Sequence, residues 1–172
     1  MKGNNIVLIG MMGAGKSTVG IELSTLLDFA FIDIDDELEK RTGVSIPIIF
    51  DVEGEDGFRE REAKLIEEVT TFEKTVISTG GGAILAEQNR VNLQSAGTVV
   101  YLSATVELLY KRTRHSKNRP LLNNQDAKKT LSNLYSCRHN LYSQTADLTV
   151  ESGNMTPKEM AVFIKQGIFG QD

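Results

Sequence analysis

Short apolar runs alternate along the chain with segments whose apolar residues recur at helical spacing. Five of these runs have the length and composition of buried strands, namely 6–10, 29–35, 75–79, 98–102 and 147–150. Helical spacing predicts helices near 16–27, 35–42, 59–73, 86–95, 105–113, 126–145 and 157–167. Since strands that alternate with helices build a parallel sheet covered on both faces, we predict an α/β fold with three layers, α/β/α, around five parallel strands.

Size, charge and cysteine content narrow the class of protein. The chain has 172 residues, of which 40 % are hydrophobic, so it is long enough for one domain with a substantial core. Its net charge of −4 gives no electrostatic footprint for nucleic acid or an anionic membrane, and no apolar run approaches the ~18 residues of a membrane span. Cys137 is the only cysteine, which favours a reducing compartment, and the opening MKGNN leaves no room for a signal peptide. We therefore expect a cytoplasmic protein.

A phosphate-binding motif follows the first predicted strand. Residues 10–18 read GMMGAGKST and fit G-x-x-x-x-G-K-[ST], with Gly10, Gly15, Lys16 and Ser17 at the fixed positions. The glycines let the backbone approach phosphates closely, and N–H groups at the start of the following helix point towards them. We expect Lys16 to reach the β- and γ-phosphates of a nucleotide and Ser17 to offer its hydroxyl to Mg²⁺. The alternative, a chance glycine-rich turn, is disfavoured by the strand–loop–helix context.

Two carboxylates stand at the end of the second predicted strand, in the sequence FIDIDDELE. Because side chains alternate along a strand, we expect Asp33 and Asp35 to point the same way. Beside a phosphate loop, one of them would hold Mg²⁺ and the other would accept a proton from an attacking hydroxyl. The alternative is that Asp35 caps the following helix. Asp36 and Glu37 are interpreted as solvated acids of its first turn.

The third strand leads into three consecutive glycines, Gly80 to Gly82. Such a run binds an anion or turns the chain tightly, and beside the phosphate loop we expect it to form a wall of the acceptor site. Arg59 and Glu62 are three residues apart on a predicted helix, so they can touch. They form either a clamp for a carboxylate or an ordinary surface ion pair.

Arg138 lies on the apolar stripe of the helix predicted over 126–145. With Leu134 and Leu141 on the same stripe, its guanidinium needs an anionic partner, which is a carboxylate of the chain or of a ligand. The segment 114–126 is polar, basic and rich in asparagine, and it joins two helices without apolar periodicity. A connection of that kind is either a functional lid or a plain exposed loop.

Together these motifs resemble the shikimate kinases, a family in the nucleoside monophosphate kinase-like group of P-loop proteins. The matching stretches occur in family order over nearly the whole chain: GMMGAGKSTVG, FIDIDDELE, SIPIIFDVEGEDGFRERE, TGGGAI, NRPLL and RHNLYSQTA. The resemblance implies a single P-loop kinase domain over 1–172, with an acceptor-binding region at about 33–62 and a mobile lid at about 114–124. It also implies a monomer that transfers the γ-phosphate of ATP, with Mg²⁺, to the 3-hydroxyl of shikimate.

The same resemblance implies a role for individual residues. The ATP-binding positions are Gly13, Ala14, Gly15, Lys16, Ser17, Thr18, Arg112 and Arg119, and the stretch 152–157 would form the second side of the adenine slot. The shikimate-binding positions are Asp35, Arg59, Gly81, Gly82 and Arg138. Ser17 and Asp33 match the positions that hold Mg²⁺. The catalytic positions are Lys16, Asp35 as the candidate base, and Arg119 as a lid arginine that meets the ATP phosphates.

Other functions fit parts of this pattern. Another small-acid kinase of the group, such as a gluconate kinase, would also need an acid-binding pocket. A GTPase-like switch would need a guanine-reading N-K-x-D, which the sequence lacks. A non-catalytic nucleotide-binding paralogue is disfavoured by the intact Lys16, Ser17, Asp33 and Asp35.

Overall fold

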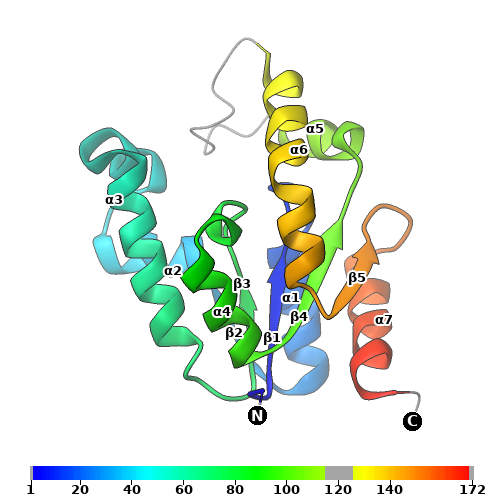
Figure 1. The fold of residues 1–172 in the computed structure, drawn as a ribbon. Coiled ribbons are helices and arrows are strands. Elements are labelled where there is room, and N and C mark those ends of the chain that lie inside the picture. Colours follow the sequence, from blue (N-terminus) through cyan, green and yellow to red (C-terminus); the bar gives the residue numbers. More distant parts are fainter. Residues whose placement is uncertain (1, 115–125, 171–172) are drawn as a thin grey trace.

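Five parallel strands form the centre of the molecule and run in the order β2-β3-β1-β4-β5 (Figure 1). The structure is a computed structural model, and it describes residues 2–114 and 126–170. The strands are β1 Asn5–Ile9, β2 Ala30–Asp33, β3 Thr75–Ser78, β4 Gly97–Ser103 and β5 Leu148–Glu151. Each neighbouring pair is parallel, which confirms the predicted α/β fold with a five-stranded parallel sheet in the described part of the chain.

Helices cover both faces of the sheet. They are α1 Lys16–Leu27, α2 Ile34–Thr42, α3 Ile46–Val69, α4 Glu87–Ala96, α5 Val106–Thr113, α6 Ala127–Thr145 and α7 Pro157–Phe169, with a short 3₁₀ helix, η1, at Ala83–Leu85. Helices α1 and α7 pack together on one face, whereas α3, α4 and α6 lie on the other (Figure 1). No helix within 2–114 or 126–170 has both the length and the apolar composition that crossing a bilayer requires.

The central strands bring three loops together at one edge of the sheet. Every residue of β1 and β3 is buried, because helices cover both faces of these strands. Strands β2, β3 and β1 are neighbours and run parallel, so their carboxyl ends lie at the same edge. The segments that follow them, 10–15, 34–36 and 79–82, therefore meet there, as ligand-binding loops of open α/β sheets do.

Helix α3 begins earlier than the sequence predicted. Instead of starting near 59, it spans Ile46–Val69, with Pro47 in its first turn, and it is interrupted at Gly54, where φ is 71° and ψ is −177°. A proline fits the first turn of a helix because its missing N–H has no partner to lose there. The predicted start was wrong because the break at Gly54 shifts the helical periodicity between the two halves.

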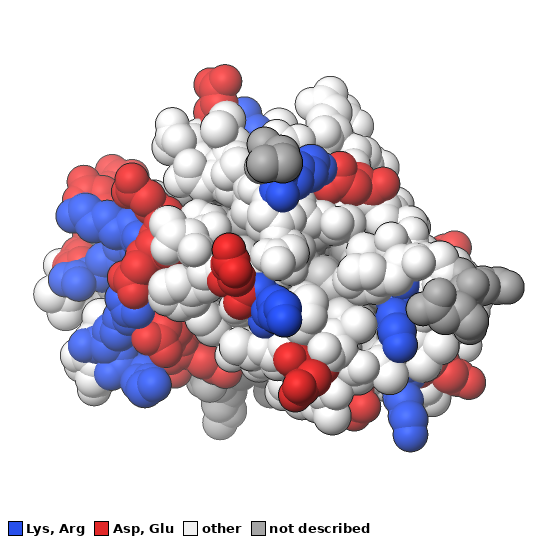
Figure 2. Space-filling view, turned by 90° about the horizontal axis from the view of Figure 1, so that it is seen from below, with Lys and Arg blue, Asp and Glu red and all other residues white. Residues whose placement is uncertain are grey.

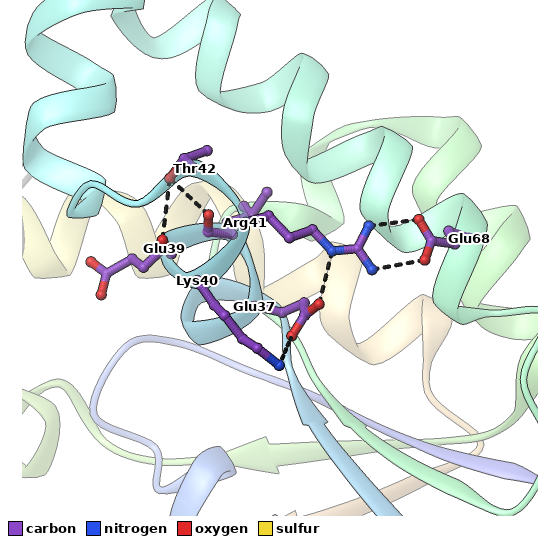
Figure 3. A network of polar contacts seen from close by, with 7 residues as sticks. Glu37, Glu39, Lys40, Arg41, Thr42 and Glu68 are labelled. Carbon is purple, nitrogen blue, oxygen red and sulfur yellow. Dashed lines mark hydrogen bonds and ion pairs between the residues drawn. The ribbon is translucent and has the colours of Figure 1, made fainter.

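Ion pairs tie α2 to α3 on the outside of the molecule. Arg41 of α2 donates from both terminal nitrogens to Glu68 of α3 at 2.7 Å, and from Nε to Glu37 at 2.8 Å (Figure 3). Within α3, Arg61 donates to Glu53 at 2.6 and 2.7 Å, across the break in the helix. Figure 2 shows acidic and basic side chains intermingled on this side of the molecule. Exposed pairs contribute about 0–1 kcal/mol each, so they add little to the stability of the fold.

Candidate active site

The loop between β1 and α1 has a backbone geometry that suits phosphate binding. Gly13 and Gly15 have φ angles of 83° and 97°, a region that glycine enters without strain. No side chain caps the start of α1, which leaves its first N–H groups for an anion. The Lys16 ammonium donates to the carbonyl oxygens of Gly10 and Met11 at 2.8 and 2.9 Å, so it lies across the loop. Positive charge and N–H groups thus converge on one concave segment.

Ser17 and Asp33 are in direct contact beside this loop. The Ser17 hydroxyl donates to Oδ2 of Asp33 at 2.5 Å, and the two side chains line a cavity of about 220 Å³ that Lys16, Asp35 and Asp36 also line. Among the described residues there is no group of three or more His, Cys, Asp or Glu side chains that could hold a metal ion by themselves. This donor set matches a cation that takes one or two protein oxygens and completes its shell with phosphate and water, as Mg²⁺ does.

The geometry behind the prediction for Asp33 and Asp35 was wrong, although both side chains line the same cavity. Strand β2 ends at Asp33, and Asp35 lies in the first turn of α2, so strand alternation does not orient the pair. The residue that caps α2 is Asp33, whose Oδ1 accepts from the N–H groups of Asp35 at 3.0 Å and Asp36 at 3.4 Å. Asp36 is exposed in the first turn of α2, as predicted, and it also lines the cavity.

Asp35 is the carboxylate in this cavity with the most perturbed environment. The pKa of its carboxyl is raised from 3.8 to about 7, chiefly by burial and also by the nearby charges of Asp33 and Glu62, while Lys16 and Arg59 oppose the shift. Its Oδ1 is buried and has no hydrogen-bond partner among the described residues. A carboxyl that titrates near neutral pH exchanges a proton readily under physiological conditions.

Two glycines after β3 leave room for charged groups. A Cβ on Gly80 would lie 2.9 Å from Oε1 of Glu62 and 3.0 Å from Oδ1 of Asp35. A Cβ on Gly82 would lie 2.1 Å from Nη2 of Arg59, a distance that requires something to move. The glycines therefore let a carboxylate pair and a guanidinium reach the strand end.

The ion pair between Arg59 and Glu62 is not an ordinary surface pair. Nη1 of Arg59 donates to Oε2 of Glu62 at 2.6 Å, and the Glu62 side chain is fully buried with 0 % exposure. Burial raises the pKa of the Glu62 carboxyl, and the charges of Arg59 and Arg138 counteract that shift. The Arg59 guanidinium also lies 5.1 Å from the ring centroid of Phe58, and Glu55 contacts it at 3.3 Å. The guanidinium is thus held in place while it remains partly open to a ligand.

Arg138 is a buried cation without an ion-pair partner in the described part of the chain. It is 3 % exposed on α6, no carboxylate lies within 4.0 Å of its guanidinium, and Nη1 has no hydrogen-bond partner there. Nη1 would lie 3.7 Å from a Cβ on Gly81. Of the two partners predicted from the sequence, the internal carboxylate is not in contact, so the geometry favours the carboxylate of a ligand.

A second cavity lies on the other side of the phosphate loop. It has a volume of about 330 Å³ and is lined by Gly13, Ala14, Gly15, Thr18, Val19, Arg112, Ser152, Met155, Pro157 and Met160. Arg112 donates to the Gly13 carbonyl at 3.1 Å and to the Ser152 hydroxyl at 2.9 Å, and that hydroxyl donates to the Ala14 carbonyl at 2.9 Å. The cavity therefore brings Arg112 and the stretch 152–157 together beside the loop, in the arrangement expected of a base-binding slot.

Two regions do not belong to the two cavities at the phosphate loop. Arg119 and the remainder of the predicted lid after Arg114 lie outside the described residues. The cavity with the largest volume among those described, about 480 Å³, lies between α2 and α3 and contains none of the predicted site residues. We assign the site to the two cavities at the phosphate loop, because they hold the loop glycines, the lysine and the acidic residues.

The comparisons with known proteins point to one family. Residues 12–168 match the family model described as shikimate kinase. A shikimate kinase of Nitrosospira multiformis is 49 % identical over 162 residues, which cover 94 % of this chain and 83 % of that protein.

Solved structures agree. The structure of shikimate kinase from Acinetobacter baumannii in complex with shikimate matches with a TM-score of 0.95 and 44 % identity, over 96 % of this chain and 93 % of that one. A gluconokinase from Sinorhizobium meliloti matches with a TM-score of 0.55 at 16 % identity, over 97 % and 90 % of the two chains, and shares the fold alone.

Proposed function

The chain belongs to the shikimate kinase family, and from this membership we propose how its residues carry out the reaction. The protein is an ATP-dependent phosphotransferase of aromatic amino-acid biosynthesis. It transfers the γ-phosphate of ATP to the 3-hydroxyl of shikimate. The observation that carries this function is Arg138, a buried guanidinium that lacks an ion-pair partner in the described chain and borders the glycine wall. A carboxylate on the acceptor supplies the anion that this guanidinium needs.

The nucleotide would bind on both sides of the phosphate loop. The adenine would enter the cavity bordered by Arg112 and the stretch 152–157, and the phosphates would lie on the N–H groups of residues 13–18. Lys16 would exchange its contacts with the loop carbonyls for contacts with the β- and γ-phosphates. Arg119 would add a second cation over the γ-phosphate when the lid at about 114–124 closes, which also keeps water from the reaction.

Ser17 and Asp33 would hold Mg²⁺ together with phosphate oxygens. Their oxygens are adjacent and border the cavity below the phosphate loop, which fits the hard oxygen donors that this cation prefers. When bound, Mg²⁺ supplies positive charge that neutralises the phosphate oxygens during transfer. The hydrogen bond from the Ser17 hydroxyl to Asp33 holds the two residues near each other.

The acceptor would lie between α3, the glycine wall and α6. Arg59 and Arg138 approach that wall from two helices, α3 and α6, and would bind the shikimate carboxylate. Gly81 and Gly82 would line the face of the shikimate ring. A side chain at Gly82 would occupy the space of the Arg59 guanidinium, so glycine at this position leaves room for that cation. Asp35 would orient the 3-hydroxyl and take its proton, and a pKa near 7 suits a base that is regenerated at neutral pH.

The phosphoryl acceptor is tested directly by ADP release. Purified protein with ATP and Mg²⁺ is assayed with shikimate, quinate and gluconate. We expect turnover with shikimate, with a far lower kcat/KM for gluconate, which lacks the ring that the glycine wall would line. Equal turnover with gluconate, or none with shikimate above background ATP hydrolysis, contradicts the function.

We further propose that the enzyme works as a monomer in the cytoplasm. The sequence offers a single cysteine, Cys137, which is an exposed free thiol and is compatible with a reducing compartment. Sedimentation of the purified protein tests the oligomeric state.

A further inference from the structure

The hydroxyl of Tyr142 makes a hydrogen bond that the proposed mechanism does not use. It donates to the carbonyl oxygen of Gly81 at 2.5 Å, although 61 residues separate the two positions in the chain. The Tyr142 side chain is 1 % exposed, and its hydroxyl also contacts Sδ of Met11 at 3.7 Å. Burial raises the pKa of Tyr142, so the hydroxyl remains a protonated donor at any physiological pH.

This contact determines the direction of a neighbouring amide. The Gly81 carbonyl and the Gly82 N–H belong to one planar trans peptide, so they point in opposite directions. With its carbonyl held by Tyr142, the peptide turns the Gly82 N–H away from α6. That N–H donates to no group within the described residues, and the Arg59 guanidinium lies beside Gly82. A free amide donor and a cation therefore stand next to each other.

We propose that Tyr142 is a positioning residue for acceptor binding, which aims the Gly82 amide at the acceptor by holding the Gly81 carbonyl. The proposal rests on the proposed function, in which Gly81 and Gly82 line the acceptor. Glycine peptides rotate easily, because no Cβ restricts their φ and ψ. Without a donor at Gly81, the amide would lose its fixed orientation, and the buried carbonyl would lose its partner.

Tyr101 provides a matched control in the same aromatic stack. Its ring lies 5.0 Å from the ring of Tyr142 with an interplanar angle of 21°, and both side chains are 1 % exposed. The Tyr101 hydroxyl, however, makes its hydrogen bond with Nδ1 of His139 at 3.1 Å and not with the glycine wall. Tyr101→Phe and Tyr142→Phe thus each remove one phenolic oxygen from the same aromatic stack. Only Tyr142→Phe removes a hydrogen bond to the glycine wall.

The test compares the two variants in steady-state kinetics with shikimate, ATP and Mg²⁺. For Tyr142→Phe we expect the KM for shikimate to rise about tenfold, with the KM for ATP unchanged and kcat altered by less than about threefold, since one binding hydrogen bond is lost. For Tyr101→Phe we expect all three parameters to stay near the wild-type values, although Tm falls in both variants. A purely structural role would instead lower the Tm of Tyr142→Phe and leave its KM for shikimate unchanged.

Two results overturn the proposal. One is a KM for shikimate in Tyr142→Phe that stays within about twofold of the wild type. The other, which needs no variant and so survives a failure of Tyr142→Phe to fold, is an unchanged ¹⁵N–¹H resonance of Gly82 when the wild-type protein is saturated with shikimate. Failure of the proposed function would look different, because the wild type itself would then not turn over shikimate.

Discussion

Arg59 and Glu62 form an ion pair of 2.6 Å in which the carboxylate is fully buried, and this burial sets it apart from a second pair on the same helix. Arg61 and Glu53 also meet at 2.6 Å, but both of their side chains are partly exposed, at 45 % and 34 %. Water screens the charges of the exposed pair, whereas Glu62 is shielded from water, and the other carboxylate at Arg59, that of Glu55, is 48 % exposed and more distant at 3.3 Å. The two pairs should therefore contribute differently to the free energy of unfolding, although their N···O distances are the same.

We predict that Glu62→Gln lowers the free energy of unfolding by about 3 kcal/mol, because it leaves the Arg59 guanidinium beside the glycine wall without its buried partner. The matched variant Glu53→Gln should cost about 1 kcal/mol or less, as is usual for an exposed pair. Urea unfolding of both variants measures the difference. Equal losses would mean that burial of Glu62 does not control the strength of its pair.

The sequence alone predicted the parts of the molecule whose structure is local. The phosphate loop could be recognised because strand, loop and helix are contiguous, and the strands stood out because central parallel strands are apolar throughout. The start of α3 was missed because the break at Gly54 interrupts the periodicity. The end of β2 was missed because Asp33 is a strand residue and a helix cap at once, a double role that propensity does not reveal.

The relations between distant segments could not be predicted. Whether Arg138 has an internal partner depends on which carboxylates approach α6, and the sequence left both possibilities open. The hydrogen bond from Tyr142 to Gly81 joins α6 to the loop after β3, so no spacing of residues along the chain predicts it. The roles assigned to the site residues stay predictions until kinetic, binding and unfolding measurements test them.

Asp35→Asn should reduce kcat by about 10²- to 10⁴-fold, the usual contribution of a positioned base. ATP binding should change little, since Lys16 and the loop N–H groups would hold the phosphates. In the wild type, kcat/KM should rise with pH through about 7, because the free enzyme must lose the Asp35 proton before it can accept another. A variant with weak ATP binding and normal turnover would assign Asp35 to the metal or to the fold instead.

The same carboxyl should make stability depend on pH. Its pKa of about 7 in the folded protein lies above the ordinary value of 3.8, so ionisation costs more in the folded state than in the unfolded state. The carboxyl therefore lowers the stability of the wild type progressively as the pH rises from about 4 to about 7, by at most about 4 kcal/mol. Asp35→Asn removes this penalty, so its Tm advantage should widen between pH 5 and pH 8. A constant difference would contradict the raised pKa.

Arg138 offers the clearest separation between binding and stability. Arg138→Lys keeps the charge but loses the planar fork that holds a carboxylate with two bonds. We expect the KM for shikimate to rise at least about tenfold, which corresponds to about 1.4 kcal/mol, with the KM for ATP unchanged. Isothermal titration with shikimate checks that the loss is one of binding and not of turnover.

Arg138→Met then decides between the two partners that the sequence left open. It replaces a 3 % exposed guanidinium, which has no ion pair in the described structure, by an apolar side chain of similar length. Removing a buried charge that forms no direct ion pair should leave the free energy of unfolding unchanged within about 1 kcal/mol or increase it, while saturable shikimate binding disappears. If Arg138 were paired with an internal carboxylate, the same change would cost about 3–5 kcal/mol. A large fall in Tm with an unchanged KM for shikimate would therefore refute the carboxylate clamp.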